Sequence, residues 1–323
     1  MDLKCIAYDS INDLEKQVKL QSGYFQSYEY FKIQKQIGNE PIYFVVQDFD
    51  EGSPTFGLNA INLFIYSQKD RVIRSIGEPS FFSIQARPSL HEILKSVDDY
   101  AKNKKVVLTI IDSLEFGIKQ IYQQRGYKSK YYETSILNLE QSESELLTTF
   151  KKELRRMLKK DFSIKIKEIS NIEDLISIYT KCYERSNKEI PDKFIEEARY
   201  KMEYGSHKYY FAKDSKGNLL GTLAMVIYNG EAKELHSSLT QFAYDNKLPA
   251  QDFLHWHSIK EAKKLKCRTF NMAGFQKLPS TPKENGIKQF KLKYNGEVYP
   301  KVEFRKYYGI WRFYYGFKRA IQR

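Results

Sequence analysis

The chain has 323 residues, of which 41% are hydrophobic and 15% aromatic, and its formal net charge is +13. These proportions suffice for packed cores and exclude a disordered chain, and the length predicts two domains of roughly 150 residues each. No apolar run approaches the roughly 18 residues of a membrane-spanning helix, and we expect no signal peptide at the start. The cysteines, Cys5, Cys182 and Cys267, are far apart, which predicts reduced thiols and a cytoplasmic location.

The first half of the chain is predicted to alternate strands with helices. Apolar alternation and β-branched residues predict strands, helical spacing of leucine and valine predicts helices, and glycines mark the turns between them. The expected elements are a strand at 3–8, a helix at 25–38, strands at 41–48, 55–67 and 71–77, a long helix at 89–104, an apolar strand at 105–112, a short helix from 117 and a strand at 127–139.

The second half repeats this order of elements. The tetrapeptide Gly-Ile-Lys-Gln starts at Gly117 and again at Gly286, an offset of 169 residues. The strand end at Asp48 corresponds to Asp214, an offset of 166. Several features at nearly one offset predict an internal duplication with two α/β domains, each built on a mixed sheet. We place these domains at 1–140 and 141–323.

The second predicted domain starts with a linker helix at 142–160 and ends with a C-terminal helix that packs back on the first domain. Ser142 and Glu145 form a predicted capping box for the linker helix. Residues 1–140 carry 17 Lys and Arg against 18 Asp and Glu, whereas 141–323 carry 36 against 22. This charge asymmetry favours an anionic partner for the second half, although a solubilising lysine-rich surface remains the alternative.

Several segments resemble one known family. "IYQQRGY" (121–127) is similar to a helix end of the GNAT acyltransferase fold. "YFQSYEY" (24–30), the Ser-x-x-Glu and basic-helix stretch at 131–160, the long-helix segment at 248–274 and "GIKQFKLKYNGE" (286–297) together resemble the FemAB-type peptidyltransferases and the related BioF2-like acyltransferases, which have two tandem GNAT domains. The resemblance covers nearly the whole chain, and its most specific part is the Phe-Lys motif of the last segment.

The resemblance implies that an amine attacks an activated carbonyl, so positive charge is needed where negative charge develops on the carbonyl oxygen. The resemblance implies that Lys291 of the Phe-Lys motif is a catalytic cation and that Asp112 is a catalytic acid or base. The alternative role for Asp112 is to cap the next helix. The implied substrate-binding residues are Phe290, Lys288, Arg155, Arg156 and Gln26. The alternative for Lys291 and for these residues is a structural role, on a helix surface or in a local turn.

The donor and acceptor stay open at this point. The coenzyme A pyrophosphate loop is missing before the helix at 249–266, which favours aminoacyl-tRNA over acyl-coenzyme A as the donor. The implied acceptor is an amino group of a peptidoglycan-type cell-envelope precursor, and the alternative is an amino sugar or exopolysaccharide unit. A third possibility is a catalytically silent module that binds RNA or anionic lipid.

The expected cofactors and location follow from the same residues. We expect no tightly bound cofactor and no metal, since His255 and His257 lie two apart on a helix and face different ways. The basic and aromatic tail at 307–323 allows peripheral contact at the inner face of the membrane.

Overall fold

The computed structural model describes residues 2–9, 24–49, 57–75, 80–81, 86–114, 119–185 and 189–311. The chain forms two compact units. Unit 1 comprises Met1–Tyr132 and Pro300–Arg323, and unit 2 comprises Glu133–Tyr299. No helix in the described part of the chain has the length and apolar character needed to cross a bilayer.

This division differs from the predicted boundary between residues 140 and 141. The last strand, β13 (Glu297–Tyr307), explains the difference because its residues from Lys301 onward pair antiparallel with a strand of unit 1. The segment that returns to unit 1 also buries Val302 and Phe304 in its core. The predicted C-terminal helix falls mostly within 312–323, outside the described residues.

The division also changes the reading of the net charge. Unit 1 holds 24 Lys and Arg against 17 Asp and Glu, a net charge of +7, and unit 2 holds 29 against 23, a net charge of +6. The asymmetry between the linear halves arises mostly because the segment from Pro300 onward carries seven basic residues and one acidic residue, and partly because Glu133 and Glu140 belong to unit 2. Excess positive charge is therefore a property of both units.

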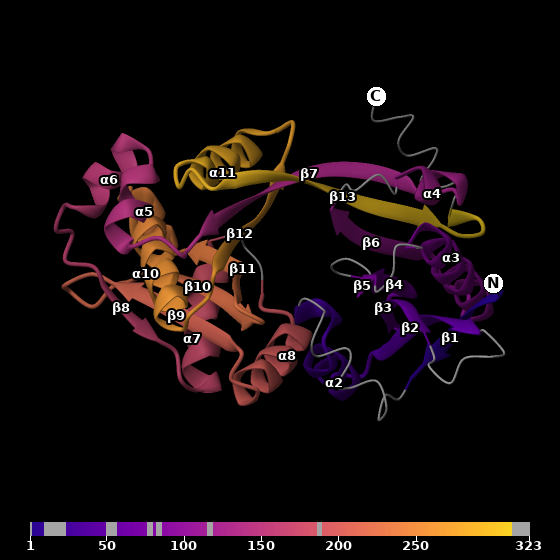
Figure 1. The fold of residues 1–323 in the computed structure, drawn as a ribbon. Helices are drawn as coiled ribbons and strands as arrows, with labels where there is room; N and C mark the ends of the chain where they lie inside the picture. Colours follow the sequence, from indigo (N-terminus) through magenta and orange to yellow (C-terminus); the bar gives the residue numbers. More distant parts are fainter. Residues whose placement is uncertain are drawn as a thin grey trace. The chain divides into compact units, whose positions relative to one another are not determined.

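Unit 1 is a mixed sheet with helices packed on it (Figure 1). The strands follow the order β1-β2-β3-β4-β6-β13, with β5 beside β3, and among the described residues only β4 and β6 are paired in parallel. Its strands besides β13 are β1 (Asp2–Tyr8), β2 (Glu40–Phe49), β3 (Gly57–Ser67), β4 (Val72–Ser75), β5 (Ser80–Phe81) and β6 (Leu108–Leu114). Its helices are the 3-10 helix η1 (Tyr24–Gln26), α2 (Tyr28–Gln36), α3 (Ala86–Asn103) and α4 (Lys119–Gln124).

Unit 2 has a second mixed sheet, with the strand order β7-β12-β11-β10-β9-β8. Only β11 and β12 are paired in parallel among the pairs with a described register. Its strands are β7 (Lys128–Asn138), which starts in unit 1, β8 (Lys165–Glu168), β9 (His207–Lys213), β10 (Leu219–Tyr228), β11 (Glu231–Leu239) and β12 (Thr269–Gln276). Its helices are α5 (Glu143–Thr149), α6 (Lys152–Leu158), α7 (Ile172–Glu184), α8 (Asp192–Glu203), α9 (Gln241–Asp245), α10 (Ala250–Lys264) and α11 (Pro282–Leu292).

The two units repeat one order of elements. In each, an antiparallel hairpin (β2 and β3, or β9 and β10) is followed by a strand, a long helix and a parallel strand. The parallel pairs are β4 with β6 and β11 with β12, joined by α3 and α10 respectively. A short helix then follows in each unit, α4 or α11. The predicted α/β fold with two similar halves is confirmed.

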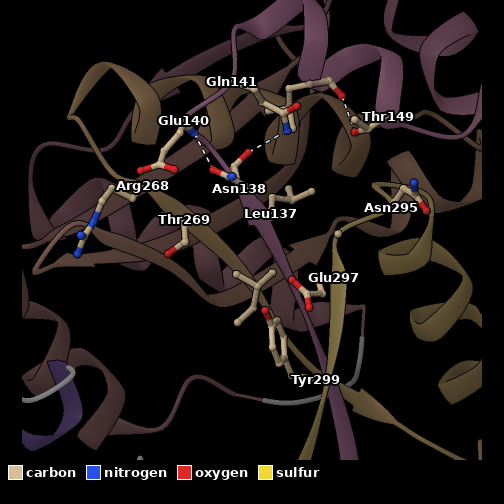
Figure 2. Close-up of a pocket in the computed structure, with 13 residues that line it drawn as sticks. Leu137, Asn138, Glu140, Gln141, Thr149, Arg268, Thr269, Asn295, Glu297 and Tyr299 are labelled. Atoms are coloured by element: carbon tan, nitrogen blue, oxygen red, sulfur yellow. Dashed lines mark hydrogen bonds between the residues drawn. The ribbon is translucent and has the colours of Figure 1, made fainter.

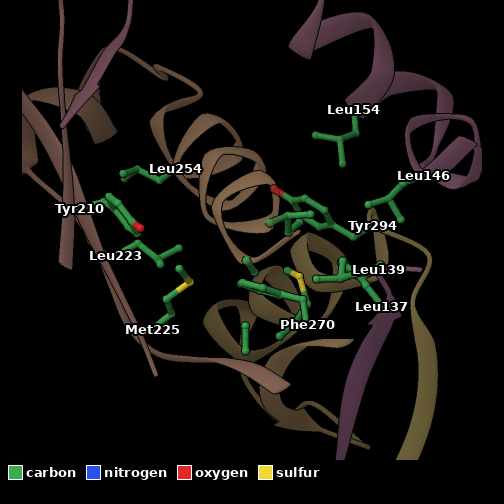
Figure 3. Packing of buried hydrophobic residues seen from close by; sticks show 14 of the residues in the cluster. Leu137, Leu139, Leu146, Leu154, Tyr210, Leu223, Met225, Leu254, Phe270 and Tyr294 are labelled. Carbon is green, nitrogen blue, oxygen red and sulfur yellow. The ribbon is translucent and has the colours of Figure 1, made fainter. Parts of the chain in front are cut away.

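The core of unit 2 lies between its sheet and α10 (Figure 3). Leu254 from the helix and Leu223, Met225 and Phe270 from the strands are all fully buried. Burying a side chain of this size contributes about 1.5–3 kcal/mol to folding. This packing fixes α10 against the strands that carry the candidate site.

The predicted linker helix at 142–160 is two helices. α5 starts with the predicted capping box between Ser142 and Glu145, but Phe150 takes an extended conformation with φ −64° and ψ 152° and ends it. The Phe150 ring enters the core, 5.6 Å from the Trp256 ring and 5.2 Å from the Tyr294 ring. Burial of this aromatic ring decides the break, which helical spacing alone did not indicate.

Candidate functional site

The parallel strands β11 and β12 separate after a short paired stretch. Pairing covers only Glu231–Lys233 against Thr269–Asn271, although both strands continue. Ala273 follows on β12 with a positive φ of 57°, and its N–H donates to the Asn271 side chain at 2.9 Å. Beyond the paired stretch, the backbone acceptors of β12 need other partners.

Lys291 supplies those partners from α11. The helix starts with Thr281 at its N-cap and Glu284 closing a capping box, and Lys291 lies in its last turn. The Lys291 ammonium donates to Met272 O and, at 3.4 Å, to Gly274 O, and it lies 3.4 Å from Glu234 Oε2. An ammonium has three donors, and two of them bond these backbone carbonyls, whereas Glu234 Oε2 lies at ion-pair distance without a hydrogen bond. Lys291 is only 7% exposed.

Glu234 is the anion beside this buried cation. It is the first residue of β11 after the paired stretch and is 5% exposed. Its Oε1 accepts from Ser237 Oγ at 2.8 Å. Burial alone raises the pKa of Glu234, but His255, Lys291 and Ser237 outweigh burial and lower that pKa to about 2. The carboxylate is therefore ionised at neutral pH.

His255 on α10 completes the cluster and is fully buried. Its Nδ1 bonds to Gln251 O at 2.8 Å, and because a carbonyl only accepts, Nδ1 carries a proton. Its Nε2 faces Glu234 Oε2 at 3.4 Å, and neither of these buried atoms has a hydrogen-bond partner. Phe290 covers the imidazole with a ring-to-ring distance of 4.9 Å. Glu234, His255 and Lys291 thus form one buried ionisable cluster, the kind of group that concentrates at functional sites.

The α11 residues named from the sequence meet in unit 2. Lys291 belongs to the cluster and Phe290 packs against its His255, whereas Lys288 forms an ion pair with Glu133 at 3.1 Å and donates to Lys277 O at 2.7 Å. Sequence reasoning missed Glu234 and did not place His255 here. One signal was available: Glu234 stands two residues after buried Ala232 on β11, which puts a charged residue at an inward-facing strand position.

Arg155 and Arg156 lie in the last turn of α6. Lys151, the residue before this helix, donates its backbone N–H to Lys293 O at 2.9 Å, which joins the start of α6 to the end of α11. Arg156 is exposed and Arg155 half-buried. Within the described ranges, no carboxylate lies at ion-pair distance from either guanidinium. Both are therefore open to an anionic ligand.

Asp112 and Gln26 belong to unit 1. Asp112 on β6 pairs with Lys301 at 3.5 Å and keeps a partly exposed side chain. Gln26 is 3% exposed, accepts the Leu63 N–H at 2.6 Å and donates to Ser75 Oγ at 3.3 Å. The amide of Gln26 thus joins η1 to β3 and β4, while Asp112 keeps an accessible carboxylate.

A separate hollow of about 540 Å³ lies at the start of β12, before the carbonyls that Lys291 binds (Figure 2). Its wall combines apolar side chains, among them Leu137 and Leu146, with charged residues of both signs, Arg268, Glu140 and Glu297. Gly296 lines it, and a Cβ there would lie 2.6 Å from Ser135 Oγ and 2.9 Å from Ile136 O. This close approach explains the glycine that ends the segment at 286–296.

No family model and no curated protein matches the sequence. Among solved structures, the chain is similar to FemX, with a TM-score of 0.67 and 13% identity over 95% of this chain and 98% of that one. It is also similar to a tandem GNAT protein from the clavulanic acid biosynthesis pathway, with a TM-score of 0.64 and 8% identity over 95% and 99%. The chain has the tandem GNAT fold.

A third solved structure has a related arrangement. The C-terminal domain of a putative lysylphosphatidylglycerol synthetase from Agrobacterium fabrum has a TM-score of 0.54 and 12% identity over 90% of this chain and 89% of that one. The predicted FemAB-like tandem GNAT fold is therefore confirmed. Identities this low establish the fold, and function has to be argued from the site.

Proposed function

We propose that the protein transfers an acyl or aminoacyl group to an amine, with the cluster around Lys291 as its active centre. The observation that carries this proposal is the Lys291 ammonium, held by Glu234 and by two carbonyls where β11 and β12 separate. A cation fixed in a low-dielectric setting stabilises the negative charge that develops on an attacked carbonyl oxygen.

The reaction needs the cation to reach the substrate. The amine nitrogen attacks the carbonyl carbon, the bond to the donor's oxygen or sulfur breaks, and a base takes the proton from the amine. The bond from Lys291 to Gly274 O is long, at 3.4 Å, and is the one most easily exchanged for a bond to the substrate oxygen. Asp112 stays the acid or base that the family resemblance predicts, and its partly exposed carboxylate in unit 1 can be tested by Asp112→Asn.

Aminoacyl-tRNA is the donor that we propose. Unit 2 carries a net charge of +6, and Arg155 and Arg156 have no carboxylate partner in the described part of the chain. Arginine binds phosphate in a two-pronged geometry and suits a nucleic-acid backbone. Acyl-coenzyme A is the alternative donor, since it also brings phosphates.

The proposed acceptor is the amino group of a peptidoglycan-type cell-envelope precursor, and an amino sugar or exopolysaccharide unit is the alternative. Such precursors carry phosphate, which suits the positive charge of both units. In this proposal the protein works in the cytoplasm, with peripheral membrane contact where the acceptor is lipid-linked.

The test is the substitution Lys291→Met, which removes the positive charge and keeps a side chain of similar volume. It should lower the turnover number by about 10²- to 10³-fold, the loss typical of removing one donor to a developing oxyanion. Transfer would be measured with charged tRNA and with acyl-coenzyme A as donors. Lys283→Met is the matched control, because Lys283 lies on the same helix with an exposed side chain. Full turnover by Lys291→Met would show that the site is assigned wrongly.

A second candidate function follows from the same geometry. The Lys291 ammonium donates to two backbone carbonyls and lies beside a carboxylate, as expected for a cation that only holds the separated strands together. The protein would then be a catalytically silent module that binds RNA or anionic lipid. Absence of turnover with either donor, together with RNA binding that weakens steeply with salt, would favour this candidate.

A further inference from the structure

Unit 1 contains a small hollow whose wall is basic. It has a volume of about 240 Å³ and is lined by Arg125, Gly126, Lys128, Arg305, Lys306 and Tyr307. None of the described residues in this wall is acidic. The hollow is formed by the end of α4, the start of β7 and the last residues of β13. It belongs to unit 1 and shares no residue with the cluster around Lys291.

Asp98 on α3 forms ion pairs with two of these cations, Arg125 and Lys306. Its carboxylate accepts from Lys306 Nζ at 2.7 Å and from Tyr308 OH at 2.9 Å, and it lies 3.4 Å from Arg125. The Lys306 ammonium also lies 5.3 Å from the centre of the Tyr127 ring. Cations ordered before binding lose less conformational entropy when a ligand arrives, so the wall is preorganised.

The ion pairs do not neutralise the wall. Arg305 pairs with Glu303, whereas Lys128 has no carboxylate at ion-pair distance in the described ranges. Four cations, Arg125, Lys128, Arg305 and Lys306, therefore face two carboxylates, Asp98 and Glu303, which leaves a local net charge of +2. A phosphate monoester carries a charge of about −1.5 to −2 at neutral pH, which matches this excess.

We propose that this hollow binds the phosphate group of a phosphorylated ligand. Guanidinium and ammonium groups gathered around one hollow suit the several oxygens of a phosphate better than the two oxygens of a carboxylate, although the successive β13 residues Arg305 and Lys306 project to opposite faces of the strand. The volume lies below the 300–1,000 Å³ of pockets that enclose a whole drug-sized ligand, so the site holds a head group and leaves the remainder outside. This site goes beyond the proposed transfer reaction and does not depend on it.

Calorimetric titration of the full chain with inorganic pyrophosphate tests the proposal. Arg305→Gln and Lys128→Gln should each weaken binding about tenfold or more, since each removes a charge-assisted hydrogen bond. Lys102→Gln removes the same charge from the exposed surface of α3, where the lysine side chain is 71% exposed, and should leave binding unchanged. Circular dichroism checks that each variant is folded.

The outcomes separate the sources of phosphate. Binding to vesicles containing phosphatidic acid, a phosphate monoester, that pyrophosphate displaces would identify a lipid head group, and pyrophosphate binding without vesicle binding would identify a soluble phosphorylated compound. Equal weakening by all three substitutions would overturn the proposal in favour of diffuse surface charge. Absence of binding to both probes would also overturn it. Neither result tests the role of Lys291, so the phosphate-site proposal can be wrong while the proposed transfer reaction is right.

Discussion

At the scale of single residues, the pairing of Glu234 with Lys291 has the largest consequence for stability. Glu234→Gln removes the negative charge and leaves the ammonium buried with only neutral acceptors. Removing one partner of a buried ion pair costs about 3–5 kcal/mol, so we expect the free energy of unfolding in urea to fall by this amount. Glu140→Gln is the control, because Glu140 is exposed, and it should change stability by less than about 0.5 kcal/mol.

The same pair predicts how stability changes in acid. Folding lowers the pKa of Glu234 from 4.5 to about 2. Its contribution to stability is therefore complete above pH 4.5 and is lost as the pH falls toward 2. In urea titrations across this range, the difference between the native chain and Glu234→Gln should shrink. A constant difference between about pH 5 and about pH 2 would show that this carboxyl does not titrate as the cluster requires.

At the scale of elements, we expect alanine substitution at two glycines of one segment to change the stability of the chain in opposite directions. Gly286 lies within α11, and a Cβ there meets nothing within 4 Å, so Gly286→Ala should stabilise the chain by up to about 1 kcal/mol through helix propensity. Gly296→Ala would force a Cβ against Ile136 O and should destabilise the chain by about 1–3 kcal/mol. Thermal unfolding of the two variants checks this, and equal effects would contradict the described packing of β13 on β7.

The sequence predicted elements that depend on local signals. The repeated order of strands and helices, the capping box at Ser142 and the short helix carrying Lys291 all follow from spacing and turn residues. The break at Phe150 and the meeting of Glu234 with His255 did not follow, because they depend on which distant rings and strands pack together. Lys291 itself was found through the family resemblance, and its buried partners came only from the structure.

The repeat also shows why one copy of the short helix carries a charge. Tyr122 on α4 and Lys291 on α11 stand at the same place in the two copies, 169 residues apart. Tyr122 is fully buried and stacks on Phe304 with a ring-to-ring distance of 3.9 Å. Lys291 is also buried but binds an anion and two carbonyls. The substitution exchanges ring packing for a polar cluster, so if one unit carries the chemistry, it is unit 2.

At the scale of the whole molecule, the chain crosses between its units twice, and this path decides how truncation acts. A chain that ends at Tyr299 lacks the part of β13 that pairs with β6. It also lacks Val302 and Phe304, which are almost completely buried in the core of unit 1. We therefore expect unit 1 to unfold while unit 2 keeps its core, although the deletion is made at the far end of the sequence from β1.

Hydrogen exchange measured by mass spectrometry checks this expectation. Peptides from β2 and β3 should lose protection in the chain that ends at Tyr299, whereas peptides from β10 and α10 should keep it. A chain that ends at Trp311 retains β13 and is the control, with protection expected in both units. Loss of protection in unit 2 instead would mean that the segment from Pro300 belongs with the second half of the sequence. The result thus decides whether the sequence boundary near residue 140 or the boundary formed by strand pairing describes the folding units.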